Sequence, residues 1–212
     1  MNSGRKLFFI ILFLGSVLGA AFAQEEAEKT PAVNWKMALL KKNGSAYESL
    51  ALRRPLTMTR KDSFQIYLAF DSTGYCYVVQ ENDAGKLPLV YRKTFSPGDR
   101  LTLPPGSNLP DESRNFKAAE LIGANHFYVI VSAQPRQNLE RLMDQYEQEP
   151  GTPALERSIL SEVLATRRSI TSRTDIVETP VSPTKSDRAM KGQLWLFEGR
   201  DAWVITVVVR IQ

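Results

Sequence analysis

The sequence predicts a mainly β protein, an antiparallel β-sandwich to which two amphipathic helices are added. Many short apolar segments are separated by turns rich in Gly, Pro, Asp and Asn, which is typical of sandwiches and barrels. Only two segments repeat their apolar residues with the period of a helix. The length of 212 residues suits one domain with a substantial core, which we place at residues 33–212.

The first two strands are predicted to form a hairpin. Large apolar side chains occupy every second position of Trp35–Leu39, the period of a half-buried strand. Asn43-Gly44 is a strong turn signal, so we expect the chain to return as a strand over residues 46–52.

A second hairpin is predicted from residues 64–70 and 75–80, with Asp71–Gly74 as its turn. Tyr75–Val79 is apolar on both faces, which is typical of a strand covered on both sides. We therefore expect this strand at the centre of the core.

Further apolar runs end at turn residues and predict strands at 86–91, 100–103, 126–133 and 193–198. Pro88 suggests an edge or a bulge in the first of these. The last strand, 202–211, is apolar on both faces, so we expect it to be internal in its sheet.

A helical insertion is predicted at residues 136–165. Two apolar stripes support it: Leu139, Leu142, Met143 and Tyr146, and then Leu155, Ile159, Val163 and Leu164. Because exposed apolar faces are costly in water, we expect both stripes to pack on the sheet, while docking of a partner there stays open. Residues 166–191 are rich in Ser, Thr, Pro and charge and predict a mobile loop.

The N-terminal residues predict export. Arg5 and Lys6 precede the apolar run Leu7–Leu14, and small residues follow it. This pattern is typical of a signal peptide, here residues 1–23, cleaved between Ala23 and Gln24. The alternative is an uncleaved membrane anchor, which the Gly, Ser and Ala of the last third disfavour.

The residue after the predicted cleavage point disfavours a lipoprotein, because Gln24 stands where the lipid-modified Cys would be needed. Residues 24–32 are acidic and nearly free of large apolar side chains, so we expect a short disordered leader. The sequence therefore predicts a periplasmic or secreted protein without a stable membrane anchor after cleavage.

Composition limits the classes of partner. The chain has 27 Lys and Arg against 23 Asp and Glu, and Arg5 and Lys6 of the predicted signal peptide contribute half of the net charge of +4. Since no dense basic block remains, nucleic acid is not an expected partner. Cys76 is the only cysteine, so no internal disulfide can form. We expect it to be buried, while pairing between chains stays open.

The sequence displays no assembled catalytic chemistry. His126 is the only histidine and no Ser lies in a G-x-S-x-G pattern, so a Ser-His-Asp hydrolase is not indicated. One His and one Cys cannot make the usual metal sets, and Asp71, Asp83 and Asp99 are explained by turns. Phosphate-binding loops are absent. We expect no catalytic, metal or cofactor-binding residues, and the residues that bind a ligand stay unassigned.

Two possibilities for carbohydrate chemistry stay open. Two carboxylates that are distant in sequence could meet in the fold and hydrolyse a glycoside. Aromatic side chains could form a sugar-stacking platform, although strand alternation favours core positions for most of them. These aromatics are Trp35, Trp195, Trp203, Tyr67, Tyr75 and Tyr77.

A series of short features occurs in a fixed order between residues 60 and 135. They are Arg60-Lys61-Asp62-Ser63-Phe64, Thr73-Gly74 with Tyr75–Val79, Asn82-Asp83-Ala84-Gly85-Lys86, Ser96-Pro97-Gly98-Asp99 with Leu101–Pro104, and Gly123 before Phe127–Ser132 and Pro135. In this order, and with the C-terminal strands, they resemble the bacterial family catalogued as domain of unknown function 4384. The sequence departs from the family at Tyr91, which precedes Arg92 where the family often has an aromatic-proline pair.

The resemblance implies a non-catalytic β module of the kind found beside signalling, protease-like or envelope domains, with no catalytic residue to carry over. Residues 136–191 look like an addition to the family's compact core. We therefore expect an exported interaction module of the bacterial cell envelope, whose partner is an envelope protein or glycan. The alternatives are a carboxylate-dependent glycan hydrolase and an envelope assembly factor that docks through the helices of 136–165.

Overall fold

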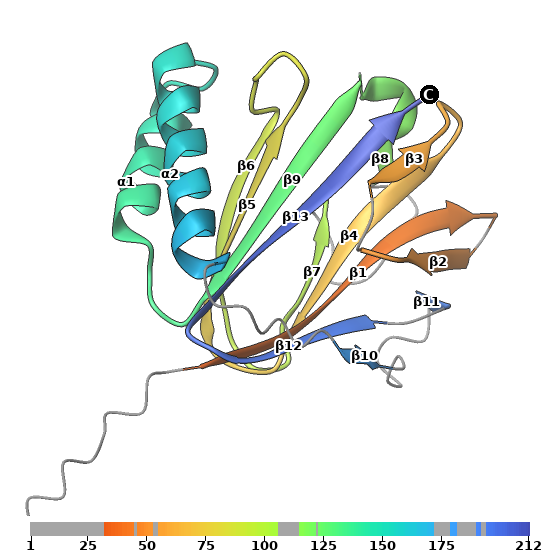
Figure 1. Ribbon diagram of the computed structural model, residues 1–212, viewed down its shortest axis with the longest axis horizontal. Helices are drawn as coiled ribbons and strands as arrows, with labels where there is room; N and C mark the ends of the chain where they lie inside the picture. The colour runs from red at the N-terminus through yellow and green to blue at the C-terminus, as the bar shows by residue number, and fades with distance from the viewer. Residues whose placement is uncertain are drawn as a thin grey trace, which may run out of the picture. The chain divides into compact units, whose positions relative to one another are not determined.

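The chain folds as two β-sheets that pack face to face, with two helices on the outer face of the smaller sheet (Figure 1). The computed structural model describes residues 32–212 apart from 45, 53–54, 106–114, 122, 172–178, 182–189 and 192–193. The predicted signal peptide, its cleavage point and the predicted leader up to residue 31 lie outside the described residues. Contacts group Pro31–Gln212 as one unit. The prediction of a mainly β sandwich with two added helices is confirmed.

The larger sheet is organised around β1 (Val33–Asn43) and β4 (Ser63–Phe70), which pair antiparallel. On the other edge of β1, β12 pairs with the first half of the strand and β2 pairs with the second half. The sheet is completed, among the described residues, by β2 (Ala46–Leu50), β7 (Arg100–Leu103), β8 (Phe116–Lys117), β10 (Thr179–Val181), β11 (Met190–Lys191) and β12 (Leu194–Arg200).

The smaller sheet has its strands in the order β3, β13, β9, β5, β6. Its members are β3 (Leu56–Met58), β5 (Gly74–Glu81), β6 (Leu89–Phe95), β9 (Ala124–Ser132) and β13 (Ala202–Ile211). Only the short β3–β13 pair is parallel; the other neighbours are antiparallel. A 3-10 turn, η1 (Ala118–Glu120), lies between β8 and β9.

The predicted first hairpin is confirmed, with Asn43 opposite Ala46. The predicted second hairpin is wrong, because β4 and β5 follow each other in the chain but lie in different sheets. The turn between them carries the chain across the sandwich and enters the smaller sheet at Gly74. A Cβ on Gly74 would lie 2.6 Å from the carbonyl oxygen of Ser132, so this close approach requires glycine.

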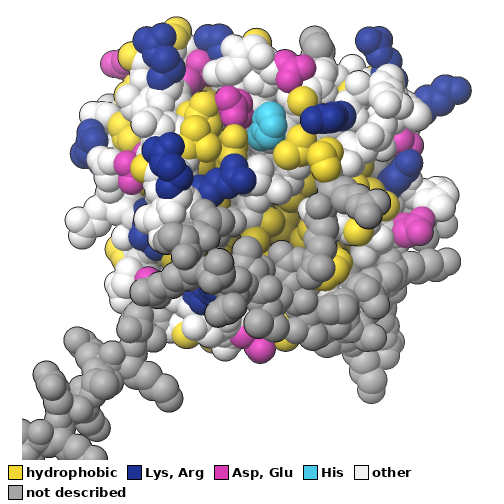
Figure 2. Space-filling model, viewed as in Figure 1, with side chains coloured by type: hydrophobic (Ala, Val, Ile, Leu, Met, Phe, Trp, Pro, Cys, Tyr) yellow, Lys and Arg dark blue, Asp and Glu magenta, His cyan; other side chains and the backbone are white. Residues whose placement is uncertain are grey.

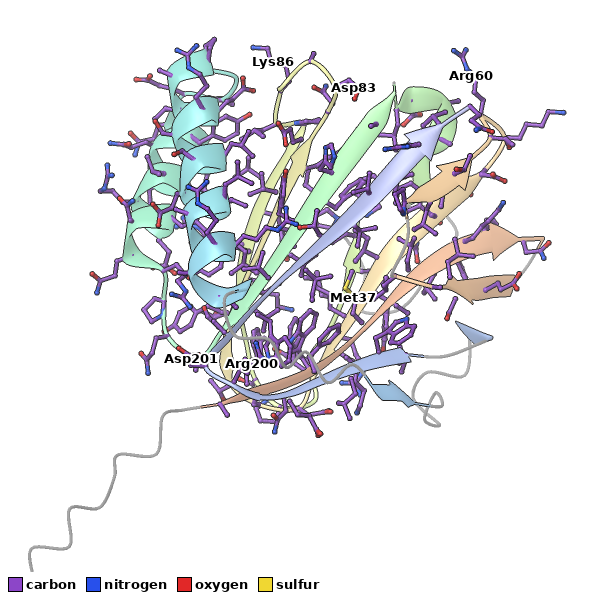
Figure 3. The ribbon with its side chains drawn as sticks, viewed as in Figure 1. Met37, Arg60, Asp83, Lys86, Arg200 and Asp201 are labelled. Carbon is purple, nitrogen blue, oxygen red and sulfur yellow. The ribbon has the colours of Figure 1, made fainter. Side chains whose placement is uncertain are left out.

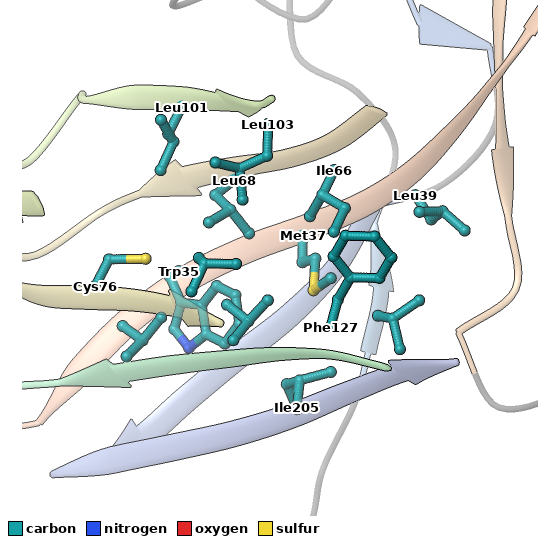
Figure 4. Packing of buried hydrophobic residues seen from close by; sticks show 14 of the residues in the cluster. Trp35, Met37, Leu39, Ile66, Leu68, Cys76, Leu101, Leu103, Phe127 and Ile205 are labelled. Atoms are coloured by element: carbon teal, nitrogen blue, oxygen red, sulfur yellow. The ribbon is translucent and has the colours of Figure 1, made fainter. Parts of the chain in front are cut away.

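The core lies between the two sheets. Met37, Ile66, Phe127 and Ile205 come from four strands of both sheets and meet in the space between them (Figure 4). Cys76 is fully buried in the same cluster, as the sequence predicts. β5 lies between β6 and β9, so the predicted central position of Tyr75–Val79 is also confirmed.

The two helices are α1 (Gln137–Gln148) and α2 (Pro153–Thr171). Their apolar stripes pack on the outer face of the smaller sheet, where Leu139 and Ile159 are buried with Tyr77 and Ile130. The expectation that the stripes pack on the sheet is confirmed.

The predicted boundary between the helical insertion and the loop needs correction. α2 continues to Thr171, beyond the predicted end at 165, because Arg167 and Arg168 are good helix formers and Ile170 still contacts the apolar cluster under the helices. β10 and β11 also lie within the predicted loop 166–191. The prediction of mobility over 172–178 and 182–189 concerns residues outside those described.

The last strand, β13, pairs with β9 from Ala202 to Arg210, but β3 pairs with its opposite edge only at Val209–Ile211. The prediction that this strand is internal in its sheet therefore holds only for its C-terminal end. Over residues 202–208, no described strand pairs with the edge of β13 that faces away from β9. Its side chains are buried by the layers on each face, Val204 among the residues under the helices and Trp203 in the core. Among the described residues, no helix has both the length and the apolar character needed to cross a membrane.

Candidate functional site: the groove between α1 and α2

The two helices form an antiparallel hairpin whose apolar sides are committed to the sheet. The connection turns at Gly151, whose φ of +77° favours glycine. Near the open end of the hairpin, the Asn138 Nδ2 donates to Glu162 Oε2 at 2.6 Å. The sides of α1 and α2 that remain outward are polar, and between them lies a solvent-open groove.

The groove runs along the hairpin in two adjoining sections of about 560 and 480 Å³, which share Asn138 and Glu162. Small, exposed side chains of α2 make up much of its lining. These are Ala154, Ser158, Ser161 and Ala165. Their spacing of three and four residues places them on one helical face, which leaves room beside α1.

Basic residues dominate the charged lining of the groove. Arg136, Arg141 and Arg157 line it, and Glu162 is the one acidic residue among the described lining residues. Arg141 bonds within its own helix, from Nη2 to Asn138 Oδ1 at 2.8 Å. Arg157 is exposed and forms no hydrogen bond or ion pair with a described residue. The described lining therefore holds three cationic side chains and one carboxylate, which accepts a hydrogen bond from the neutral Asn138 amide.

Polar contacts fix α1 on the sheet beneath the groove. The Tyr77 hydroxyl donates to Glu140 Oε1 at 2.8 Å and accepts the backbone N–H of Arg136 at 3.0 Å. Burial, the largest cause, and the bond to Glu140 raise the pKa of Tyr77 above its usual value, so the phenol stays protonated. These contacts anchor the first turn of α1 to β5.

The other end of the hairpin is held by charge pairs. Arg92 on β6 contacts Asp144 at 2.6 Å and Glu147 at 3.3 Å, both on α1. On α2, the Glu156 side chain is buried and accepts from Lys86 Nζ at 3.2 Å and from the Leu87 N–H at 3.3 Å. The walls of the groove are therefore fixed by contacts to two strands and a loop of the smaller sheet.

A second surface lies on the part of the smaller sheet that the helices leave uncovered. Figure 2 shows the single histidine on this face, with hydrophobic side chains on both sides. The His126 ring stacks on Tyr128 at 6.3 Å, and the Tyr128 hydroxyl donates to Glu81 Oε2 at 2.9 Å. Burial is the largest cause that raises the pKa of Tyr128 to about 12, and the hydrogen bond to Glu81 is the next. Tyr128 itself is buried in the cluster under the helices, so only His126 and Glu81 of these residues are partly exposed on this surface.

The structure brings few acidic residues together in a way that suits glycoside hydrolysis. Asp144 and Glu147 converge on Arg92, but both side chains are exposed on α1 and lie outside the groove lining. Both carboxylates contact the same Arg92 nitrogen, so they form an ion-pair cluster and are not two free carboxylates on opposite sides of a substrate. Within the described part of the chain, no group of three or more His, Cys, Asp or Glu could hold a metal ion.

The aromatic residues considered for a sugar platform are mostly in the interior. Trp35, Trp203, Tyr67 and Tyr77 are all buried, Trp35 by stacking on Phe197 at 4.4 Å. Tyr75 and Trp195 are partly buried against the two apolar clusters. The structure does not assemble these side chains into one exposed platform.

Sequence reasoning missed the groove, although it located both helices. The sequence did contain a signal, a row of small residues in α2 with arginines outside the apolar stripes nearby. The small residues are Ala154, Ser158, Ser161 and Ala165. A row of this kind also occurs on ordinary exposed helix faces, so only the pairing with α1 reveals a groove.

Comparison of the chain with protein-family models, curated proteins and solved structures finds no match.

Proposed function

We propose that this protein is an exported, non-catalytic interaction module of the bacterial cell envelope, which binds an anionic envelope component in the groove between α1 and α2. The observation that carries the proposal is the groove lining, with three arginines and one engaged glutamate. The N-terminal pattern of residues 1–23 supports export.

The proposal unites two expectations from the sequence, an interaction module and docking through the helices. Because the apolar stripes are buried on the sheet, a partner would meet the polar outward sides of the helices and the groove between them. The polar lining favours binding by charge and hydrogen bonds, which salt weakens. A hydrolytic function finds no support in the described grooves, since Glu162 is their single acidic lining residue.

The experiment compares capture from envelope extracts and binding to purified peptidoglycan by three forms of the mature protein. One is unaltered, the second carries Arg141→Glu with Arg157→Glu in the groove, and the third carries Arg60→Glu with Lys61→Glu. Arg60 and Lys61 are exposed in the turn before β4, and their replacement gives the same change in charge. Arg60 lies away from the helices (Figure 3).

The expected result is a partner retained by the unaltered form and the Arg60/Lys61 form, lost by the groove form, and released as salt rises. Capture from extracts detects an acidic protein partner, whereas binding to purified peptidoglycan detects a carboxylate-bearing glycan. Capture of nothing in either arm at several salt concentrations would contradict an interaction module, and equal capture by all three forms would place binding outside the groove.

A further inference from the structure

The tip of the β1–β2 hairpin combines an exposed asparagine with a glycine. Asn43 is the last residue of β1, and its backbone pairs with Ala46. Gly44 follows with φ of +62°, and apart from its two chain neighbours no described residue has an atom within 4 Å of the position that a Cβ would take. Both residues are exposed. The backbone nitrogen of Gly44 is therefore approached without the steric hindrance that any other residue type would add.

Asn43 differs from the other described asparagines in the contacts of its carboxamide. Each of the others has its Oδ1 held as a hydrogen-bond acceptor, whereas no described group bonds to the Asn43 side chain. The donors are the Gly199 N–H for Asn34, the Ala84 and Lys86 N–H groups for Asn82, the Tyr47 hydroxyl for Asn115, the Gln80 amide for Asn125 and the Arg141 guanidinium for Asn138. Asn43-Gly44 is also the only Asn-Gly pair in the sequence.

We propose that Asn43 is a site of spontaneous modification, at which the carboxamide is converted to a carboxylate. The Gly44 backbone nitrogen attacks Cγ of Asn43, the new C–N bond closes a five-membered succinimide, and the side-chain nitrogen leaves as ammonia with the amide proton. Water then adds to one of the two ring carbonyls and opens the ring. The products are aspartate and isoaspartate, and no oxidant or reductant is required.

The modification changes the hairpin in two ways. It places a negative charge at a position that follows Lys41 and Lys42. In the isoaspartate product the main chain also gains a methylene between the paired positions Asn43 and Ala46, which the two-residue turn cannot absorb without altering the pairing. Ageing of the protein should therefore loosen β2 at this end.

The test follows the folded protein in mildly alkaline heavy-oxygen water by peptide mass spectrometry and isoelectric focusing. We expect one heavy oxygen to enter the peptide containing Asn43, a shift of the intact protein to lower isoelectric point, and a larger converted fraction at Asn43 than at any other asparagine. Asn82 serves as the internal comparison, because it is also in a turn but its Oδ1 accepts two backbone N–H groups.

Two variants separate the mechanism from general chemical damage. Asn43→Gln removes the five-membered ring closure, and Gly44→Asp adds a Cβ beside the attacking nitrogen while keeping a residue type that tolerates positive φ. Both should lose the early shift. Conversion of Asn82 before Asn43, or equal conversion in the Gly44→Asp variant, would overturn the proposal.

Discussion

At the scale of single residues, Gly123 shows how one position joins two turns. The Asp83 Oδ2 accepts the backbone N–H of Ala124 at 2.8 Å, and a Cβ on Gly123 would lie only 1.6 Å from that oxygen. Gly123 also has φ of +64°. The turn after β5 is therefore held to the start of β9 by a contact that permits no side chain between them.

Replacement of Gly123 by alanine tests this contact. We expect Gly123→Ala to lower the free energy of unfolding by roughly 1–2 kcal/mol from the left-handed backbone, and by a further ~1.5–3 kcal/mol from the lost bond to a charged acceptor. Gly85→Ala is the matched control, because Gly85 has φ of +68° but open space at the Cβ position. Denaturant unfolding should show the larger loss at Gly123, and equal losses would contradict the contact with Asp83.

Tyr128 gives a prediction for alkaline pH. Burial and Glu81 raise its pKa from 10.0 to about 12, so the folded protein keeps a proton that the unfolded chain loses between these values. The contribution to stability is complete below pH 10 and is lost as the pH rises through about 12. The difference in unfolding free energy between the unaltered protein and Tyr128→Phe should therefore change across this window. A constant difference measured in denaturant at each pH would be inconsistent with the assigned cause.

At the scale of elements, α1 depends on the hydroxyl of Tyr77 for its first turn. Tyr77→Phe leaves the Arg136 N–H without its acceptor and Glu140 without its donor, so we expect a loss of about 1–3 kcal/mol in unfolding free energy. Tyr91→Phe is a suitable control, since Tyr91 is half-buried and its hydroxyl forms no hydrogen bond with a described residue. Hydrogen exchange should also quicken at the start of α1 in Tyr77→Phe alone, and unchanged exchange there would count against the anchoring role.

Of the two hairpins predicted from the sequence, the first is correct and the second is wrong. The alternation of Trp35–Leu39 and the Asn43-Gly44 turn predicted the β1–β2 hairpin, because its pairing is local. The same kind of pattern on each side of Asp71–Gly74 predicted a hairpin that does not form. A turn that returns within one sheet and a turn that crosses to the other use the same residue types, and the choice depends on contacts with distant residues such as Ser132.

The helix that ends at Thr171 illustrates a different limit. Ser, Thr and Arg after residue 165 suggested a loop by composition, yet Val163, Leu164 and Ile170 still reach the apolar cluster over the sheet. Tertiary packing thus extends α2 beyond the point where its own sequence pattern fades.

At the scale of the whole molecule, β13 connects the C-terminal segment to the core. It pairs with β9 from Ala202 to Arg210 and contributes Trp203, Ile205, Val207 and Val209 to the space between the sheets. We expect deletion of residues 202–212 to prevent folding, because β9 would lose a paired neighbour and the core a full row of side chains. Circular dichroism and resistance to protease check this, and a truncated chain that keeps its cooperative unfolding would refute it.

The candidate site could be predicted only in part, because it belongs to the arrangement of elements and not to a motif. The sequence located the two helices and indicated that their apolar stripes pack inward, which leaves polar residues outside. It did not indicate that Arg141 of α1 and Arg157 of α2 line one groove. Their proximity depends on how the two helices pack side by side, where Asn138 of α1 bonds to Glu162 of α2. The chemistry of these residues was visible in the sequence, but their proximity was not.

Binding in the groove is tested most directly by a hydrogen-exchange footprint of the protein bound to the component that it captures from the envelope. We expect slower exchange in peptides covering 135–142 and 154–169, which line the groove, and little change along β6 or at Arg60. Protection confined to the surface around Glu81 and His126, with no change in α1 or α2, would contradict binding in the groove.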